Sequence, residues 1–329
     1  MKVAIMHLDL PRTNWHADAI KNFTYRCLPD FGIEYNLIFH SEKYPDPCDI
    51  DLMDISEWCN PWHQEVADKY HVPVVCSTEE GSVTALRNYL MVNNINVDFM
   101  LSRISHFVAR SSWTRDMLVS FGIDRTKISV IPYGTDLDGF KPAGKEPEEP
   151  SFLYVGSINK QKGVHHLVNA YLKITRRTDW KLRLCAGEFN NDAGLLKNIE
   201  ALAKENSGIQ LIPFPPLSQL PGVYHNSTCF CFAQDCSTPA QFSTPSVWAC
   251  SCGLPLISLD TGALRDYIIN GENGFLCRNV EEFAEKMLAI TEMDWKGMGK
   301  VSRTLMEKNH SPYNVASRYR EVYVAVTET

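Results

Sequence analysis

The sequence lacks the features that mark several large protein classes. No hydrophobic run reaches the length of about 20 residues that a membrane-spanning helix needs. We expect no secretory signal peptide in the first 15 residues, because polar residues break their short apolar run and no small-residue cleavage site follows. No run of Lys and Arg stands out, and the formal net charge of −7 disfavours nucleic-acid binding. We therefore expect a cytoplasmic protein that does not bind nucleic acid.

Familiar catalytic and metal-binding motifs are also missing. Neither a G-x-S-x-G motif nor a Walker loop occurs, which removes the support for a serine hydrolase or a P-loop enzyme. The 11 cysteines include the pairs Cys229/Cys231 and Cys250/Cys252. Their C-x-C spacing differs from the C-x2-C spacing that structural zinc favours. We expect these cysteines to lie in the core and no metal to be bound.

What the sequence does contain is a regular alternation of strand and helix patterns. With 329 residues, 44% hydrophobic and 22% charged, the chain is long enough for two soluble domains. Helices are expected at residues 61–70, 111–121 and 194–206, among others. Strands are expected at residues 3–8, 35–40, 50–55, 73–78, 106–111, 127–132, 151–157, 182–187, 209–214, 228–233 and 254–259. This rhythm predicts an α/β protein with doubly wound parallel sheets.

A segment rich in Pro and charged residues divides the chain. Residues 143–151 lack apolar periodicity and are predicted to link two domains, residues 1–142 and residues 152–311. Residues 312–329 have helical spacing and are expected to pack back on the first domain. Ligands of such sheets bind outside the carboxyl ends of the strands, so we expect a cleft there.

Two stretches of the second domain have the layout of a phosphate site. A strand from Phe152 runs into a turn at Gly156, followed by Lys162 and a helix. The glycine permits close backbone approach, and the lysine and the helix start supply positive charge. Further on, Thr244 is a suitable N-cap and Pro245 suits the first helical position, so a second helix start faces the loop before it.

Three segments together resemble a known family. KISVIPYGTDLDGFKP (residues 127–142), FLYVGSINKQKG (152–163) and CGLPLISLDTGALRDYIINGENGFLC (252–277) are similar to motifs of the retaining GT-B glycosyltransferases of family four, the glycosyl transferases group 1. The resemblance implies two Rossmann-like domains that face a central cleft. It also implies transfer of a hexosyl group, with retention and without metal or other cofactor, from a UDP- or GDP-linked sugar. The acceptor would be a glycan, a lipid or a small molecule, and peripheral contact with a membrane is left open.

The resemblance also implies roles for individual residues. Lys162 would bind the donor diphosphate. Glu79 stands where the family often has a histidine, and a carboxylate there is suited to act on the acceptor's proton or on the positive charge of the transition state. The acceptor side of the first domain would include Asn14, Trp15, His16 and Glu80. The donor side of the second would include Gly156, Ser157, Lys162, Gly187, Glu188, Pro213, Phe214, Phe242, Ser243, Thr244 and Trp248.

Several positions depart from the family pattern. Ser157 replaces the diphosphate arginine, which predicts a loss of a few kcal/mol of phosphate binding. Ala240 and Trp248 replace two glutamates, and residues 14–16 replace a glycine pair. A divergent glycosyltransferase is the leading hypothesis. The alternatives are a GT-B-like binding or scaffold protein without activity, and a transferase that acts on a polymer such as modified DNA or protein.

Overall fold

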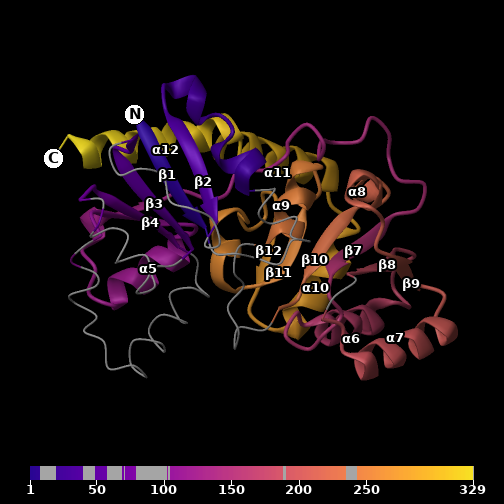
Figure 1. Ribbon diagram of the computed structural model, residues 1–329. Coiled ribbons are helices and arrows are strands. Elements are labelled where there is room, and N and C mark those ends of the chain that lie inside the picture. The colour runs from indigo at the N-terminus through magenta and orange to yellow at the C-terminus, as the bar shows by residue number, and fades with distance from the viewer. Residues whose placement is uncertain are drawn as a thin grey trace. The chain divides into compact units, whose positions relative to one another are not determined.

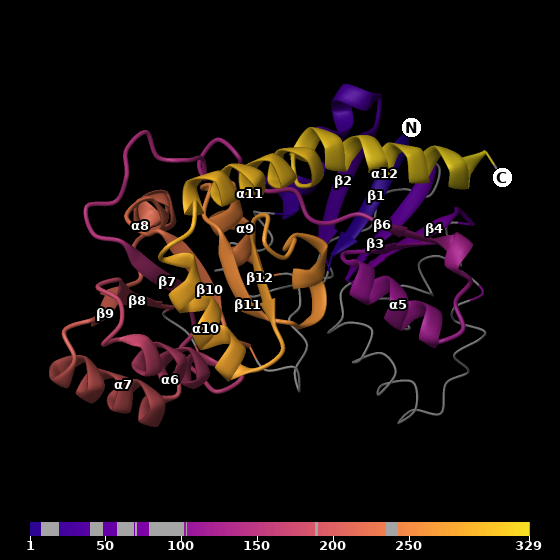
Figure 2. The same ribbon diagram turned by 180° about the vertical axis from the view of Figure 1, so that it is seen from behind.

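The chain forms two compact units (Figures 1 and 2). The computed structural model describes residues 1–7, 20–39, 49–57, 69, 71–78, 102, 104–187, 190–234 and 243–328. The first unit comprises Met1–Thr135 together with Asn309–Thr329, and the second comprises Asp136–Lys308. The chain therefore passes between the units twice, once after Thr135 and once after Lys308.

The first unit is built on a six-stranded parallel sheet in the order β2-β1-β3-β4-β5-β6. Its strands are β1 Lys2–His7, β2 Glu34–Phe39, β3 Leu52–Glu57, β4 Val74–Thr78, β5 His106–Ala109 and β6 Ile128–Val130. The described helical segments are Ile20–Tyr25, Leu28–Phe31, α5 Ser112–Ser120, Arg125–Lys127 and α12 Pro312–Thr327. Helix α5 begins where Ser111 Oγ accepts a hydrogen bond from Thr114 N at 3.0 Å, an N-cap that follows β5 directly.

The C-terminal helix α12 is fixed to the first sheet by buried polar contacts. Tyr323 Oη donates to Asp54 Oδ2 at 2.6 Å, and Ser77 Oγ donates to Asp54 Oδ1 at 2.9 Å. Tyr319 Oη lies 3.1 Å from Ser77 Oγ and also accepts from Arg110. All five side chains are buried, so each of these bonds satisfies polar atoms that water does not reach.

The second unit repeats this design with strand order β12-β11-β10-β7-β8-β9, again all parallel. The strands are β7 Ser151–Gly156, β8 Lys181–Ala186, β9 Ile209–Pro213, β10 Cys229–Phe232, β11 Leu256–Leu259 and β12 Gly274–Cys277. The helices are α6 Val164–Ile174, α7 Ala193–Glu205, α8 Leu220–His225, α9 Thr244–Ser251, α10 Val280–Ile290 and α11 Trp295–Asn309, with short turns at Leu217–Gln219 and Gly262–Asp266. In both views α6, α7 and α10 lie on one side of this sheet, and α8 and α9 lie on the other.

The predicted α/β class with two doubly wound sheets is confirmed. Each strand expected from the sequence overlaps an observed one, and β12 is the strand that the sequence pattern missed. The expected helix at residues 61–70 lies almost wholly outside the described residues. Cys229, Cys231, Cys250 and Cys252 are buried free thiols in the core of the second unit, as expected.

The second unit begins before the predicted linker because residues 136–140 are bound to it. Arg303 Nη1 donates to the carbonyl oxygens of Leu137 and Phe140 at 3.0 and 2.9 Å. The ring of Phe140 is stacked on that of Trp248. Residues 141–150, which follow, form neither helix nor strand.

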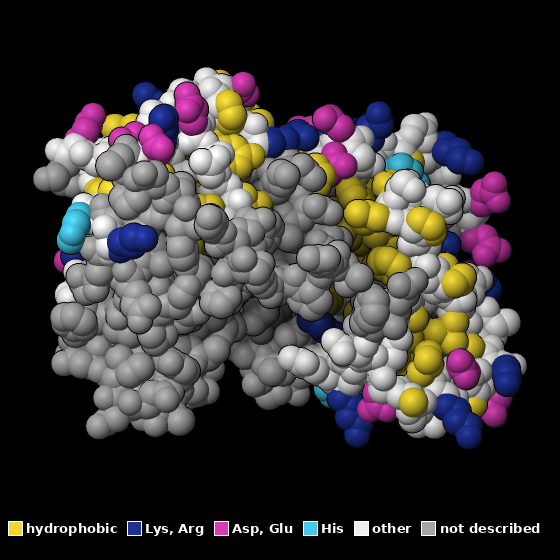
Figure 3. Space-filling model, in the orientation of Figure 1, with side chains coloured by type: hydrophobic (Ala, Val, Ile, Leu, Met, Phe, Trp, Pro, Cys, Tyr) yellow, Lys and Arg dark blue, Asp and Glu magenta, His cyan; other side chains and the backbone are white. Residues whose placement is uncertain are grey.

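The described surface carries mixed charge. On the face shown in Figure 3, Lys and Arg side chains alternate with Asp and Glu, and hydrophobic side chains gather on the second unit. None of the helices within the described residues is both long enough and apolar enough to cross a membrane.

Candidate functional site

Most of the predicted donor residues that the structure describes lie at the carboxyl edge of the second sheet. Strands β7, β8 and β9 end at Gly156, Ala186 and Pro213. Because the carboxyl ends of parallel strands meet at one edge, the loops that follow them meet there too. Pro213 is exposed, and Phe214 beside it packs half-buried against the core.

The turns after β7 and β8 are joined directly. Gly187 N donates to Gly156 O at 2.9 Å, and Tyr154 Oη donates to Ser157 O at 2.7 Å. A methyl group on Gly187 would lie 3.4 Å from Ser157 N, so the two backbones are in close contact. The structure thus brings Gly156, Ser157 and Gly187 together, as the phosphate-site prediction requires.

Two asparagines, which were not predicted, hold these turns in place. Asn159 Oδ1 accepts from Lys162 N at 2.8 Å. Asn191 accepts from Ile158 N and donates to Gly187 O, each at 2.7 Å. An Asn in the loop directly after a strand is the sequence signal that could have predicted this role, because its short amide side chain bonds to nearby backbone groups.

Gly163 places Lys162 next to the end of β10. Gly163 is the N-cap of α6 and has a left-handed backbone with φ of 66°. A Cβ at this position would lie 1.7 Å from Ala233 O, so glycine alone fits here. The first turn of α6 therefore begins beside Ala233 and Gln234, which follow β10.

Lys162 is the charged group of this edge. Its Nζ lies 3.4 Å from Gln234 Oε1, and burial lowers the pKa of Lys162. Gln234 is itself 3% exposed, which makes it a fixed acceptor. An ammonium group carries three donors, so Lys162 can bond Gln234 and still donate to the oxygen atoms of an anion.

A second helix start belongs to the same unit. Helix α9 begins at Thr244 with Ser243 at the N-cap, one residue earlier than predicted, and Pro245 in the first turn. Ser243 Oγ lies 2.7 Å from Ser246 Oγ, so the serine hydroxyl bonds a side chain and does not cap a backbone N–H. The free N–H groups and the positive dipole end of α9 are suited to an anion.

Trp248 packs in the core of the second unit, and its predicted donor contact stays a prediction. Its ring is stacked on Phe140 with centroids 4.4 Å apart and an interplanar angle of 1°. It is 9% exposed and belongs to the core of the second unit. A large aromatic side chain on the inner face of α9 gains more from burial than it would at a polar donor edge.

The remaining predicted site residues stay predictions. Asn14, Trp15, His16, Glu79, Glu80, Glu188 and Phe242 lie outside the described residues. Among the described residues, no group of three or more His, Cys, Asp or Glu side chains is placed to hold a metal ion.

Comparison of the sequence with known proteins gives one family and several distant relatives. The family model of the glycosyl transferases group 1 matches residues 138–307. A D-inositol 3-phosphate glycosyltransferase of Nocardia farcinica is 25% identical over 239 residues, which are 65% of this chain and 52% of the relative. Spore coat protein SA of Bacillus subtilis is 24% identical over 265 residues, 71% of this chain and 69% of the relative. The first match thus spans about half of the relative's length.

Solved structures match over nearly the whole chain. A glycosyltransferase from Rickettsia africae has a TM-score of 0.73 at 17% identity. The match covers 100% of this chain and 99% of the Rickettsia chain. Anabaena HepE, solved in complex with UDP, has a TM-score of 0.73 at 14% identity. The match covers 99% of this chain and 100% of the HepE chain. At these identities the likeness concerns the fold, and it confirms the predicted GT-B type with its two Rossmann-like units.

Proposed function

The chain belongs to the glycosyl transferases group 1 family, and we propose that it transfers a hexosyl group from a nucleotide-diphosphate sugar to an acceptor hydroxyl. The observation that carries this proposal is the half-buried Lys162 ammonium beside Gln234, at the sheet edge where parallel α/β units bind ligands. The relatives at 24–26% identity include several proteins named as glycosyltransferases, which supports the same activity.

The diphosphate leaving group is stabilised by fixed positive charge. Lys162 donates to its oxygen atoms, and the N–H groups at the starts of α6 and α9 add partial positive charge. The lysine and the helix starts supply the charge that a divalent cation brings in other enzymes, so we propose transfer without a metal ion. Retention at the sugar carbon is proposed from the family resemblance.

We propose that the donor-side loops contact the nucleotide. Gly156 and Ser157 after β7, and Gly187 after β8, lack bulky side chains, and Pro213 and Phe214 follow β9 at the same edge, where we propose contact with the base. UDP is the first nucleotide to test, because it is bound in the HepE structure, and GDP is the second. Ser157 offers one hydroxyl where an arginine would offer a charged pair of donors, so we expect weak binding.

The acceptor is proposed to bind in the first unit. Glu79 would take the proton of the acceptor hydroxyl, and Asn14, Trp15, His16 and Glu80 would contact the acceptor. Such a carboxylate acts as a general base when it lies within hydrogen-bond reach of the hydroxyl. A glycan, a lipid or a small molecule would fit this proposal, and the net charge of −7 argues against a nucleic acid.

Thermal denaturation with added nucleotides tests the proposal. UDP or GDP at 100 times its Kd should stabilise the protein by about 2.7 kcal/mol, a rise of several degrees in Tm. AMP serves as the control, since it lacks the diphosphate and should have little effect. No rise with any nucleoside diphosphate or nucleotide sugar would overturn the proposed donor site.

A GT-B-like scaffold is the second candidate. Ser157 in place of the arginine, and Trp248 buried against Phe140 where a glutamate is expected, both favour it. A scaffold that has lost its donor site would show no response in the same thermal assay.

A further inference from the structure

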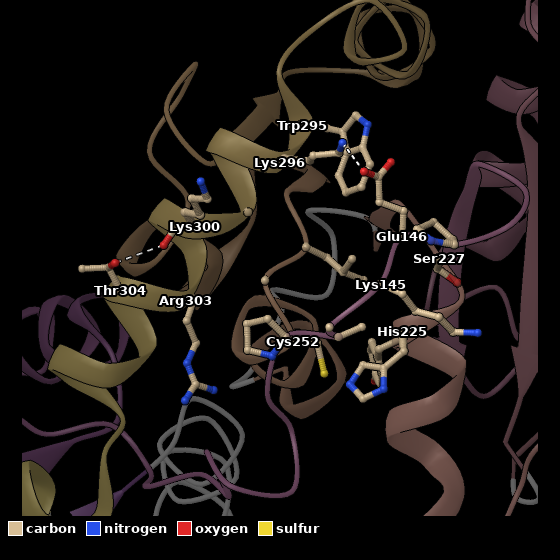
Figure 4. Close-up of a pocket in the computed structure, with 18 residues that line it drawn as sticks. Lys145, Glu146, His225, Ser227, Cys252, Trp295, Lys296, Lys300, Arg303 and Thr304 are labelled. Carbon is tan, nitrogen blue, oxygen red and sulfur yellow. Dashed lines mark hydrogen bonds and ion pairs between the residues drawn. The ribbon is translucent and has the colours of Figure 1, made fainter.

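A pocket of about 510 Å³ in the second unit has charged side chains in its wall, but these do not converge (Figure 4). Lys145 and Lys300 point away from each other, and Lys296 Nζ lies 2.5 Å from Glu146 Oε1. Arg303 is bound to backbone carbonyl oxygens of the same unit. The charged groups of this pocket are therefore engaged in its wall or directed away from one another, and they select no ligand.

A second pocket, of about 300 Å³, belongs entirely to the first unit and does bring polar groups together. One wall is a single face of α12, made by residues at the helical spacing i, i+3, i+4 and i+7. These residues are Arg318, Glu321, Val322 and Ala325. The opposite wall consists of His106 at the start of β5 and residues 129–131 in and after β6. The proposed donor residues do not contribute to this pocket.

The pocket lies at the open edge of the first sheet, because β6 is the last strand of the described sheet (Figure 2). Successive residues of a strand direct their backbone N–H and C=O groups to opposite sides. Since Ile131 N donates to Ala109 O in β5, the backbone groups of Val130 face the open edge. Arg318 on α12 donates to Val130 O and covers this edge carbonyl. That bond fixes the guanidinium group at the pocket.

Ser129, the residue before Val130, holds a histidine at the same place. His106 Nε2 lies 2.9 Å from Ser129 Oγ. Burial lowers the pKa of His106, so its ring is uncharged near neutral pH. The Cα atoms of Ser129 and Val130 are about 3.8 Å apart, as across any trans peptide. The imidazole of His106 and the guanidinium of Arg318 are therefore anchored one residue apart on the same strand.

Both anchored groups keep unused hydrogen-bonding capacity. A guanidinium has five N–H donors, and the described residues engage that of Arg318 through Val130 O alone. An imidazole has two ring nitrogens, and the described residues bond only Nε2 of His106. A carboxylate in the pocket can therefore accept charge-assisted bonds from Arg318 and a further bond from His106 or Ser129.

Glu321 decides which charged molecules fit. It lies one turn after Arg318 on the same face of α12, where side chains three residues apart are neighbours. Burial lowers the pKa of Arg318, and the negative charge of Glu321 opposes this shift. The described residues give the Glu321 carboxylate neither a hydrogen bond nor an ion pair. A purely anionic ligand would be repelled by Glu321 and a purely cationic one by Arg318, whereas a molecule with both charges suits both residues.

We propose that this pocket binds a small zwitterion with an aliphatic body, the chemistry of a free α-amino acid such as leucine. Its carboxylate bonds Arg318 and the pair of His106 and Ser129, and its ammonium group faces Glu321. The aliphatic body contacts the apolar lining residues Val130, Ile131 and Val322. The pocket shares no residue with the donor site, so the zwitterion and a nucleotide do not compete.

Calorimetric titration of the full chain with three related molecules tests the proposal. Free leucine carries both charges, 4-methylpentanoate lacks the ammonium group, and 3-methylbutylamine lacks the carboxylate. We expect one saturable site for leucine, with the same affinity in excess UDP and in Lys162→Ala. The other two molecules should bind at least about tenfold more weakly, since each loses its bonds to one charged group.

Single charge removals on α12 give the decisive comparison. Glu321→Gln should raise the Kd of leucine about tenfold without weakening the binding of 4-methylpentanoate. Glu328→Gln, at the C-cap of the same helix, is the matched control and should change neither affinity. Arg318→Gln should weaken the binding of leucine and of 4-methylpentanoate, whereas Arg320→Gln should weaken neither.

Glu321, Glu328 and Arg320 are exposed, so thermal melts should show these three variants folded whatever the fate of Arg318→Gln. Equal affinity for leucine in Glu321→Gln and Glu328→Gln would rule out the proposed contact. The absence of saturable binding of leucine, isoleucine, valine and methionine up to about 10 mM would rule out the site itself.

Discussion

Lys162 Nζ and Gln234 Oε1 lie 3.4 Å apart at the carboxyl edge of the second sheet. The two residues come from loops after different strands, β7 and β10, which are neighbours in the sheet. Gly163 brings those loops into contact, and the buried amide then fixes the direction of a lysine side chain that would otherwise be free to rotate. The donor site proposed above depends on this arrangement.

Removing the amide should weaken nucleotide binding without removing the charge. In Gln234→Leu, Lys162 loses the acceptor that orients it, and the Kd for UDP should rise about tenfold, which corresponds to one hydrogen bond to a charged group. In Gln234→Glu, the added negative charge should raise the pKa of Lys162 and compete with the phosphate. Calorimetric titrations between pH 7 and pH 10 would measure both effects. Wild-type affinity and pH dependence in both variants would mean that Gln234 does not position Lys162.

Gly163 lies so close to Ala233 O that one added methyl group should lower the stability of the protein markedly. Gly163→Ala would place Cβ 1.7 Å from Ala233 O and hold alanine at a φ of 66°. The left-handed backbone alone costs about 1–2 kcal/mol, and the collision adds to it. Gly222→Ala in α8 is the matched control, because its Cβ would meet nothing within 4 Å. Urea denaturation should show a clear loss for the first variant and none for the second, and equal stabilities would contradict the described geometry.

His310 predicts a dependence of stability on pH. Burial lowers the pKa of His310 to about 4, and the positive charge of Arg318 adds to this, while a hydrogen bond to Tyr133 O at 3.0 Å opposes it. The unfolded chain takes up the proton near pH 6.5, and the folded protein does so only near pH 4. The contribution of His310 to the free energy of unfolding is therefore fully present above pH 6.5 and is lost as the pH falls towards 4.

Between pH 7 and pH 5 the contribution of His310 should fall by about 2 kcal/mol. His310→Asn retains a donor for Tyr133 O and has no titrating ring. Its free energy of unfolding should therefore fall less over this interval, by about that amount. If the free energy of unfolding changed with pH equally in the variant and the wild type, His310 would not be a buried neutral histidine with a lowered pKa.

The sequence predicted the parts of the fold that depend on long apolar patterns. Eleven strands were found because each coincides with a short, mainly apolar stretch of the sequence, whereas β12 has four residues beginning with Gly274 and carries too weak a signal. Lys162 and the glycines near it were found because they lie close together in the sequence, at a spacing that is typical of a phosphate site. Gln234 acts through a contact between two loops, which no local pattern records. Asn159 and Asn191 bond to backbone N–H groups of the loop after β7, and their place in loops after strands is the only signal that the sequence offers for them.

The packing of Trp248 could not be predicted from the family pattern. The position is polar in the family pattern, but an indole side chain is stabilised by burial, and Phe140 lies parallel to it in the core.

The most direct test of the donor site compares two neighbouring lysines. Lys162 faces Gln234, whereas Lys160 is exposed and has no side-chain partner among the described residues. Release of nucleoside diphosphate from UDP- and GDP-sugars should be measured for the wild type, Lys162→Ala and Lys160→Ala. We predict that Lys162→Ala lowers the rate about 100-fold or more with an unchanged melting temperature, and that Lys160→Ala keeps the wild-type rate. Equal rates in the two variants would contradict the proposed role of Lys162.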